Sequence, residues 1–503
     1  MDLVPRPLRR RDRVLLLAVI GFGFLGVLYF GEFWFFSEAR RQPVYFALLS
    51  FAIFWGITRS LINWYIYFFI TPLPTRASQR SYSVDILTTA MPGEPFPMFE
   101  ETLAAIQKIS YPHRTFLLDG GNDRRLFELC AALGVEHVDC SRIEGAKAGK
   151  INHCLRHHSH SEIVLVIDPD HRPRADLFDC TLGWFDDSQV GFVQVVQAYY
   201  NRDESFVADA AAEETFGFYG PTMMGLSGLG ISTAIGANCI FRRAALDSID
   251  GHAVHLAEDA LTSMRLHAAG WRSVYVPYRG TSGLVPADLG SFFKQQFKWS
   301  TGMFYLLLHE YPKLFRRFNA VAKAHYLFAG TFYLQGLATL LTLFLPIWFL
   351  FLQVFAVEFP LDEFAIHLVP YVAGVAMSYL FVQRWYTHTS EQRLPWRSMV
   401  LEKATWHVYV MGLISGLLRR RVEYLPTPKG SDRQAMPRLV LPHLTVIGLS
   451  ASAIAFALLT YARLDDGTLL MMFFAGLNIA LLLPVTWIAI FPRYNWRLPH
   501  GAS

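Results

Sequence analysis

Two aspartates separated by a single residue follow a short apolar run in the middle of the chain. The sequence IVLVIDPDHRP places Asp168 and Asp170 directly after five apolar residues, a length typical of a buried strand. Two carboxylates this close repel each other unless a cation lies nearby, and hard oxygen ligands suit Mg²⁺ or Mn²⁺, which neutralise a bound diphosphate. A solvated turn is the alternative, because Asp and Pro both favour turns. The preceding strand favours the metal site.

A second pair of acids, Glu258 and Asp259, opens the predicted helix in HLAEDALTSMRLHAAGW. The positive end of a helix dipole stabilises acids at this position, which is one explanation for the pair. The other is a general base, since removing a proton from a hydroxyl group needs a positioned carboxylate. The sequence does not separate the two. Much of the buried side of this helix is predicted to consist of Leu261, Met264, Leu266 and Ala268.

Two further segments offer weaker indications of a phosphate or nucleotide site. EGAKAGKINHCL places Lys147 and Lys150 among small residues, which suits a diphosphate approached closely by the backbone. TTAMPGEP supplies a Pro-Gly loop directly after a predicted strand, where a nucleotide base has room to lie, although a simple turn explains it equally well.

These residues need a scaffold of strands, and residues 82–278 show the pattern for one. Short apolar runs alternate with helical patterns, as in a mostly parallel sheet flanked by helices. Ligands of open α/β sheets bind beyond the carboxyl ends of strands, where several of the candidate polar residues fall. The clearest predicted strands are VDILTTAM, RTFLLDGG, EIVLVIDPD and VGFVQVV.

Outside this region the chain is strongly apolar. Six windows are long enough to cross a bilayer, at about 14–35, 44–70, 332–356, 364–384, 438–461 and 468–491. The cluster RPLRRRDR before the first window places the N-terminus in the cytoplasm by the positive-inside rule, and six spans return the C-terminus there. The basic pair Arg40 and Arg41 lies in a loop assigned to the outside and disagrees with this topology.

Composition agrees with a protein that has soluble and membrane parts. The 503 residues are 53% apolar and 17% charged, and a net charge of +4 over this length does not indicate a nucleic-acid partner. The five cysteines show no zinc spacing and are expected to be reduced, buried thiols. They are Cys130, Cys140, Cys154, Cys180 and Cys239.

The stretch KQQFKWSTGM predicts a helix over residues 289–304 with two unlike faces. Gln295 and Lys298 lie on the polar side, Trp299 lies at the boundary, and Gln296 is an exception within the apolar arc. The pattern favours a helix at the membrane surface, with its phenyl groups toward lipid or the spans; a core helix is the alternative. The apolar arc consists of Leu289, Phe292, Phe293, Phe297, Met303 and Phe304.

Together, LLDGG, DPD, AED and QQFKW, in this order and flanked by membrane spans, resemble the processive family 2 glycosyltransferases, such as bacterial cellulose synthase. The resemblance covers about residues 82–430. It implies an α-helical membrane domain of about six spans plus interfacial helices, with an inserted cytoplasmic α/β domain of the GT-A nucleotide-sugar-binding type. The expected divisions are two transmembrane helices (1–75), the glycosyltransferase domain (80–285), interfacial helices with QQFKW (286–330), two transmembrane helices (331–386), an interfacial helix and gating loop (390–434), two transmembrane helices (437–492) and a cytoplasmic tail (493–503).

For the donor, the resemblance implies that Asp119 hydrogen-bonds the uracil of a UDP-sugar and that Lys147 helps to hold the nucleotide. Asp168 and Asp170 would hold the metal, Mg²⁺ or Mn²⁺, and the diphosphate. This chain departs from the family at Gly120, where a second acid is usual.

For the acceptor, the resemblance implies that Asp259 is the general base and that Trp299 stacks under the sugar. Glu258 would be structural, and Ala257 stands where the family has threonine. IGAN, residues 235–238, lies where the family has a loop beside the acceptor, which brings in Gly236, although the usual lead sequence is missing.

Further donor contacts are implied by the QQFKW motif and by a later loop. Gln295 and Lys298 would contact the nucleotide-sugar, with Lys298 in place of the usual arginine. VEYLPTPKG resembles the family's gating loop, in which Thr427 and Lys429 match; a proline-rich connector is the alternative.

The implied activity is polymerisation of a sugar from a UDP-sugar, UDP-glucose first, into a β-linked glucan that crosses the bacterial inner membrane. The implied partners are the donor, the growing glycan, the lipid bilayer and a periplasmic or regulatory subunit, with no cyclic-dinucleotide-binding domain in this chain. Alternatives are UDP-N-acetylglucosamine or a hexuronic acid donor, another exopolysaccharide, or a non-processive enzyme that glycosylates a lipid carrier. A transporter with a regulatory nucleotide-binding domain is the rival from another class, and it predicts more charges within the spans than this chain has.

Overall fold

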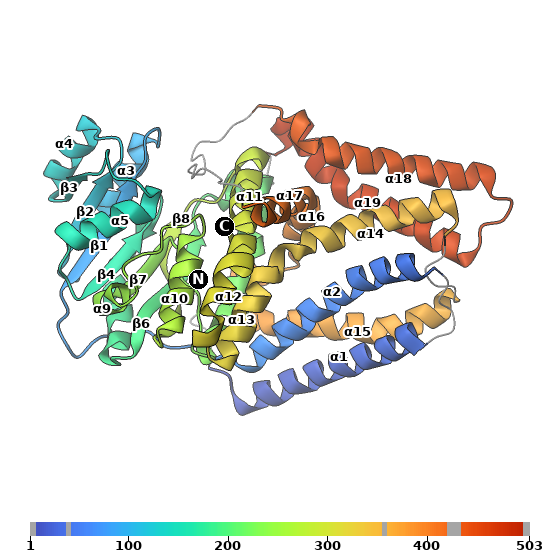
Figure 1. Ribbon diagram of the computed structural model, residues 1–503, viewed down its shortest axis with the longest axis horizontal. Helices are drawn as coiled ribbons and strands as arrows, with labels where there is room; N and C mark the ends of the chain where they lie inside the picture. Colours follow the sequence, from blue (N-terminus) through green and yellow to red (C-terminus); the bar gives the residue numbers. More distant parts are fainter. Residues whose placement is uncertain (1–6, 37–41, 355–359, 420–433, 496–503) are drawn as a thin grey trace.

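The computed structural model describes residues 7–36, 42–354, 360–419 and 434–495. An α/β domain lies at one end and a bundle of long helices at the other, with a layer of shorter helices between them (Figure 1). The α/β domain contains all eight strands of the described residues, from Val84 to Gly283. These limits fall inside the range 80–285 expected for the catalytic domain.

The strands form one mixed sheet in the order β3-β2-β1-β4-β7-β6-β8-β5. Four neighbouring pairs are parallel (β1 with β2 and β4, β2 with β3, β6 with β8), and the other three are antiparallel. The four strands predicted from sequence are β1, β2, β4 and β6, and the mixture arises because β7 and β5 run opposite to their neighbours. The bounds are β1 Val84–Ala90, β2 Arg114–Asp119, β3 Glu136–Asp139, β4 Ile163–Ile167, β5 Arg172–Pro173, β6 Val190–Tyr199, β7 Asn238–Arg242 and β8 Arg272–Gly283.

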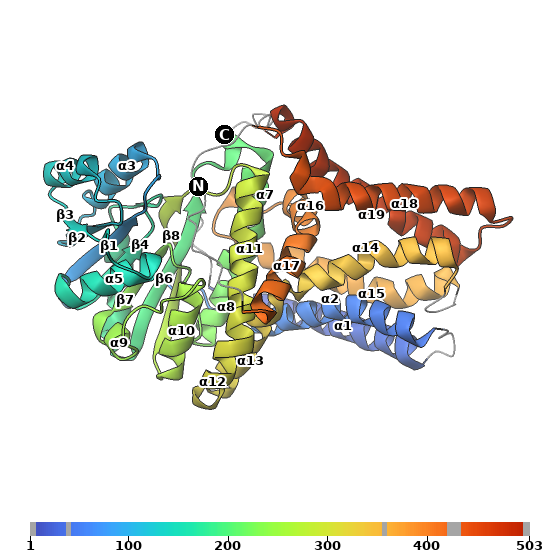
Figure 2. The same cartoon turned by 45° about the horizontal axis from the view of Figure 1, so that its top comes forward.

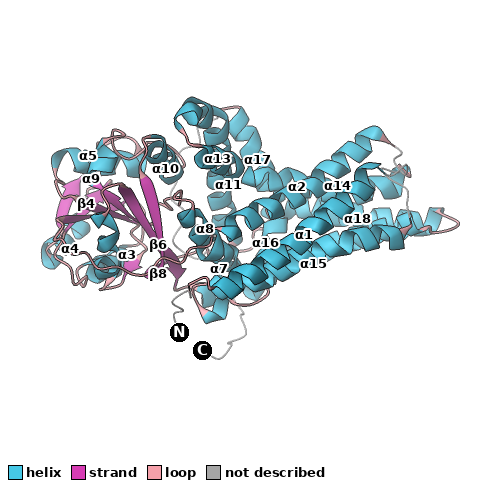
Figure 3. Ribbon diagram, turned by 90° about the horizontal axis from the view of Figure 1, so that it is seen from below, coloured by secondary structure: helices cyan, strands magenta, loops and turns pink. Residues whose placement is uncertain are grey.

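Helices cover both faces of the sheet because the strands are apolar on both sides (Figure 3). Leu87, Phe116 and Leu118 pack in one apolar cluster with side chains of α5, α9 and α10. Ile86 and Leu117 point the other way and pack with α3 and α4. The bounds are α3 Phe96–Ile106, α4 Arg124–Leu133, α5 Ala146–His157, α9 Arg243–Asp247 and α10 Glu258–Ala268. The cysteines are free, and all but the partly exposed Cys180 are buried.

Six helical segments of the described residues are long and apolar enough to cross a membrane. They match the predicted windows closely, except that the third begins at Ala320 and includes a 3-10 turn at Phe332–Leu334. The segments are α1 (Arg10–Phe36), α2 (Pro43–Phe68), Ala320–Leu352 with α13 (Ala320–Thr331) and α14 (Gln335–Leu352), Leu361–Trp385 with α15 (Leu361–Val382), Pro437–Thr460 with α18 (Leu441–Thr460), and α19 (Asp466–Ile490).

The connecting layer contains the helix predicted from KQQFKWSTGM (Figure 2). This helix, α11, runs from Leu289 to Tyr305, and the side chain of Asp288 caps its first turn by accepting from the Ser291 amide at 2.8 Å. Phe292 and Phe293 are 1% and 6% exposed and share an apolar cluster with residues of α14 and α19, so this face points toward the spans. The other helices of the layer are α7 Phe206–Gly217, α8 Met223–Gly228, α12 Tyr311–Leu314, α16 Trp396–Ala404 and α17 Trp406–Leu417.

Candidate active site

Lys147 joins two of the predicted site segments. It lies in the first turn of α5, is 5% exposed, and donates its Nζ to Asp168 Oδ1 and to the carbonyl of Gly236, the latter at 2.6 Å. Asp168 follows the last residue of β4, and Gly236 lies in the loop before β7. The carboxyl end of β4, the N-terminus of α5 and the IGAN loop therefore meet at one ammonium group.

A metal-binding cluster lies beside this lysine. Asp168, Asp170 and His171 each present a ligand atom, and these atoms lie within 4.8 Å of one another. Asp170 and His171 are each 2% exposed, and His171 Nδ1 lies 3.1 Å from Asp170 Oδ1. The ring nitrogen Nε2 of His171 is buried and has no hydrogen-bond partner in the described part of the chain. The carboxylate and imidazole set and the unpartnered nitrogen fit a divalent ion.

His171 is a site residue that the sequence reasoning missed, although it directly follows the D-x-D pair. Its ring occupies space left by Gly283 at the end of β8, because a Cβ atom on that glycine would lie 2.2 Å from the ring atoms Cε1 and Nε2. The ring is therefore positioned by two neighbours, a carboxylate and a glycine.

Asp259 lies next to the IGAN loop, where the resemblance implied a base beside the acceptor. It is the second residue of α10, and its Oδ1 accepts from the Ala260 amide at 2.7 Å. Gly236 has a φ of +76°, a conformation that disfavours residues with a side chain, and a Cβ there would lie 3.1 Å from Asp259 Oδ2. Gly236 thus contacts Lys147 through its carbonyl and faces Asp259 with its α-carbon.

The surroundings of Asp259 raise the pKa of its carboxyl group to about 7. Burial is the largest cause, and the neighbouring Glu258 carboxylate adds to it, while the charges of Lys147 and Lys298 act in the opposite direction. A carboxylate with a pKa near neutrality is well matched to accept a proton at neutral pH.

Asp119 lies at the end of β2 and is 1% exposed. Its two oxygens accept from the amides of Gly121 and Asp123 at 2.7 Å each, and His137 Nε2 lies 3.1 Å from Oδ2. These contacts hold the loop after β2 in shape. At Gly120, where a second acid is usual in the family, a Cβ would lie 2.6 Å from Cε of Lys150, so the side chain of this lysine borders the position.

A cavity of about 290 Å³ opens beside Asp119, and the Pro-Gly loop after β1 forms part of its wall. Asp119 and the Pro-Gly loop, which were both predicted to lie near the nucleotide base, therefore border the same cavity. The lining residues are Met91, Pro92, Gly93, Glu94, Phe96, Phe99, Asp119, Gly121, Asp123, Arg125 and Leu126.

The QQFKW helix α11 contacts the start of α10. A Cβ on Gly302 would lie 2.9 Å from Cβ of Ala257, so these two positions touch. Trp299 is 41% exposed, Gln295 and Lys298 are partly exposed, and Lys298 acts electrostatically on Asp259. The predicted gating-loop residues Thr427 and Lys429 lie outside the described residues.

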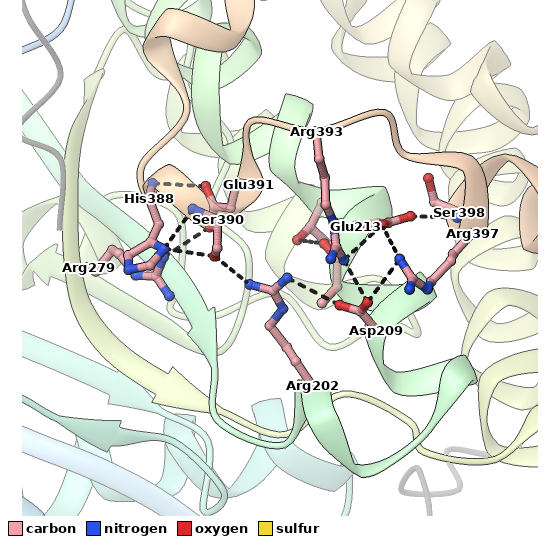
Figure 4. Close-up of polar contacts among 12 residues, drawn as sticks. Arg202, Asp209, Glu213, Arg279, His388, Ser390, Glu391, Arg393, Arg397 and Ser398 are labelled. Carbon is pink, nitrogen blue, oxygen red and sulfur yellow. Dashed lines mark hydrogen bonds and ion pairs between the residues drawn. The ribbon is translucent and has the colours of Figure 1, made fainter. Parts of the chain in front are cut away.

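An ion-pair network, also not foreseen from the sequence, joins α7 to α16 and to the segment before it within the connecting layer (Figure 4). The buried acids Asp209 and Glu213 of α7 face three arginines. Arg393 lies 2.6 Å from Asp209 and 2.8 Å from Glu213, Arg397 lies 3.6 and 3.5 Å from the same two acids, and Arg202 lies 3.2 Å from Asp209. The positive charges of these arginines offset the free-energy cost of burying the two carboxylates.

Comparison with known proteins agrees with this architecture. Residues 163–379 match the family model described as glycosyl transferase family group 2. The chain is 25% identical over 401 residues to the cellulose synthase catalytic subunit [UDP-forming] of Xanthomonas axonopodis pv. citri (strain 306), which covers 76% of this chain and 54% of the relative. The corresponding subunit of Pseudomonas fluorescens (strain SBW25) is 24% identical over 376 residues, covering 71% of this chain and 50% of the relative. The chain thus spans about half the length of these curated relatives.

Among solved structures, a mannosyltransferase from Pyrobaculum calidifontis, in complex with GDP-Man and Mn²⁺, superposes with a TM-score of 0.52 at 16% identity. The match covers 75% of this chain and all of the other. It confirms the predicted fold class, and the sequence relatives confirm the resemblance drawn from the motifs. Residues 163–379 therefore match the model of glycosyl transferase family group 2, in a chain whose described residues include six candidate membrane spans and which is similar to the catalytic subunits of bacterial cellulose synthases.

Proposed function

We propose that this protein is an inverting hexosyltransferase that transfers glucose from UDP-glucose to the end of a growing β-linked glucan. The observation that carries the proposal is the contact of Lys147 with both Asp168 and Gly236, while Gly236 also borders Asp259. Groups suited to a sugar diphosphate and a group suited to deprotonate an acceptor thereby share one site. The UDP-forming relatives support a uridine nucleotide as the leaving group.

In this mechanism Asp259 accepts the proton of an acceptor hydroxyl group, whose oxygen attacks the anomeric carbon of the donor as the bond to the diphosphate breaks. The pKa of about 7 allows the carboxylate to be present at neutral pH and still accept the proton. Asp168, Asp170 and His171 would hold Mg²⁺ or Mn²⁺, which would neutralise charge on the diphosphate when bound. Lys147 adds a fixed positive charge at the same place.

Other residues of the site orient the two substrates. Asp119 and the Pro-Gly loop border the cavity proposed for the uracil ring. From α11, Lys298 contacts the donor diphosphate and Gln295 contacts the nucleotide-sugar; Thr427 and Lys429, outside the described residues, are assigned to the nucleotide by the family resemblance alone. The exposed ring of Trp299 stacks on the acceptor sugar, and Gly236 leaves room beside the base.

We further propose that the glucan crosses the bacterial inner membrane through the helix bundle. Six candidate spans support insertion in a bilayer, and the basic N-terminal segment favours a cytoplasmic catalytic domain with both termini on the same side. A polymer of sugars cannot cross hydrocarbon unaided, and the attached spans would provide its path through the bilayer.

The test uses the purified full-length protein with radiolabelled UDP-glucose and Mg²⁺ or Mn²⁺. Wild type should form long glucans that linkage-specific glucanases digest, and Asp259→Asn should reduce synthesis by about 10²-fold or more, since general-base catalysis contributes typically 10²–10⁴-fold. Undiminished synthesis by this variant would exclude Asp259 as the base. Lys298→Ala should impair synthesis more than Lys294→Ala, the matched control on the exposed side of α11.

A panel of other nucleotide sugars in the same assay tests the donor. Polymer formed from UDP-N-acetylglucosamine but not from UDP-glucose would replace the proposed sugar and keep the mechanism. A single lipid-linked sugar in place of a ladder of glycans would identify a non-processive transferase.

A further inference from the structure

Gln296 is the polar residue that interrupts the apolar arc of α11, and it is 2% exposed. The hydroxyl group of Tyr409 on α17, itself 1% exposed, donates to Gln296 Oε1 at 3.2 Å. With its oxygen engaged, the amide turns its Nε2 toward α7, where it donates to Glu214 Oε2 at 3.3 Å. Tyr409, Gln296 and Glu214 therefore form a directed hydrogen-bond chain across α17, α11 and α7 of the connecting layer.

The far end of this chain is accessible. Glu214 keeps part of its surface exposed although its two partners are buried, and its second oxygen, Oε1, makes no hydrogen bond within the described part of the chain. The adjacent acid on α7, Glu213, differs because arginines and the Ser398 amide hold it. One oxygen of Glu214 is thus held by Gln296, and the other makes no hydrogen bond to the described residues.

Two tyrosines place Glu214 relative to the reacting groups. Tyr199 at the end of β6 interacts electrostatically with both Glu214 and Asp170 of the metal cluster. Tyr333, in the turn before α14, interacts with both Glu214 and Asp259. The hydrogen bond to Gln296 also joins Glu214 to α11, the helix that carries Trp299, the residue proposed to stack on the acceptor sugar.

From this geometry we propose that Glu214 binds a hydroxyl group of the acceptor glycan through Oε1, while Gln296 holds Oε2 in place. The inference rests on the proposed function, because it assumes a sugar acceptor that approaches Asp259. It assigns a binding role to one acid of α7 and leaves the donor side unchanged.

The surroundings make Glu214 a hydrogen-bond donor at neutral pH. Burial raises its pKa to about 8, and Glu402 of α16 contributes in the same direction. A carboxyl group with a raised pKa is protonated below that value and loses its proton as pH rises through it. The titratable groups that interact with it electrostatically are Glu402, Tyr409, Tyr333 and Tyr199. Lys403 and Arg59 act on Glu402, and Arg202, Arg393 and Arg397 hold Asp209 and Glu213 of its own helix.

The experiment compares wild type, Glu214→Gln and Glu214→Ala in nanodiscs with UDP-glucose, Mn²⁺ and cellotetraose as the acceptor. Transfer to cellotetraose and UDP release without acceptor are measured across pH 6–9. Glu214→Ala should raise the acceptor KM by about tenfold or more, as expected for losing a hydrogen bond of about 1–3 kcal/mol, and leave the donor KM unchanged. Glu214→Gln, which donates at every pH, should keep near-normal transfer at pH 7 and lose the decline that wild type shows above about pH 8.

Glu213→Gln serves as the matched control: it should lower thermal stability and retain the alkaline decline. An unchanged acceptor KM in Glu214→Ala, or the same alkaline decline in Glu214→Gln as in wild type, would overturn the inference. Equal losses of transfer and of acceptor-free UDP release would also overturn it, because they indicate damage to the donor side. A wild type that releases no UDP from UDP-glucose would refute the proposed function itself, and this inference with it.

Discussion

Replacing Gly283 with alanine should remove His171 from the metal site without changing any ligand. The backbone tolerates the substitution, because Gly283 is not among the described glycines with positive φ. The new Cβ would lie 2.2 Å from two atoms of the His171 ring, whereas ordinary van der Waals contact begins near 3.4 Å. The ring must therefore move by about 1.2 Å, the difference between these two distances.

A displacement of this size is large for a metal ligand. Ligand distances in protein sites vary by roughly 0.2 Å, so a ring shifted by about 1.2 Å no longer binds the ion. Loss of a supporting group costs roughly 10–100-fold in metal affinity, and we expect Gly283→Ala to weaken Mn²⁺ binding by at least this factor. The two carboxylates of Asp168 and Asp170 remain, so saturating Mn²⁺ should restore much of the activity.

The assay is a Mn²⁺ titration followed by electron paramagnetic resonance in the presence of UDP, together with the Mn²⁺ dependence of UDP release. His171→Ala and the double variant complete a cycle that isolates the contact. If Gly283→Ala acts by moving the ring, it should add little in the His171→Ala background. A tenfold loss of Mn²⁺ affinity in both backgrounds, or wild-type affinity in Gly283→Ala, would refute the reasoning.

The pH dependence of transfer should shift in opposite directions in two variants. Glu258→Gln removes a negative charge that raises the pKa of Asp259, so the rise of kcat/KM near pH 7 should move to lower pH. Lys298→Ala removes a positive charge that lowers this pKa, so the rise should move to higher pH. Shifts of kcat/KM in the same direction in both variants would contradict the assignment of Asp259 as the base. Gly302→Ala places a Cβ 2.9 Å from that of Ala257, and overpacking should destabilise the protein by about 1–3 kcal/mol, seen as a lower Tm with a raised acceptor KM. Chelation by EDTA should abolish UDP release, and added Mg²⁺ or Mn²⁺ should restore it; full activity in EDTA would exclude the metal.

Features that depend on short stretches of sequence were predictable. The strand before Asp168 and the six candidate spans follow from apolar runs, and α11 was predicted to within one residue at its end. The exception among the spans is the third, whose first helix, Ala320–Thr331, carries polar residues that hide its continuity with α14.

Features that depend on distant partners were not predictable. The polar position 296 was identified as an anomaly, but its partners Glu214 and Tyr409 lie 82 and 113 residues away. His171 stood beside the aspartates, yet its fit depends on Gly283, more than a hundred residues later. The reversed direction of β7 likewise follows from its pairing with β4 and β6, which no local pattern reveals.

The ion-pair network of α7 also has a consequence for biosynthesis. Asp209 and Glu213 are made 184 and 185 residues before Arg393 and Ser398, which later bind them. Until those partners emerge from the ribosome, burying the two carboxylates would cost several kcal/mol, so this face of α7 must stay hydrated. The packing of α7 against α16 in the connecting layer is therefore complete only after the fourth span has been synthesised.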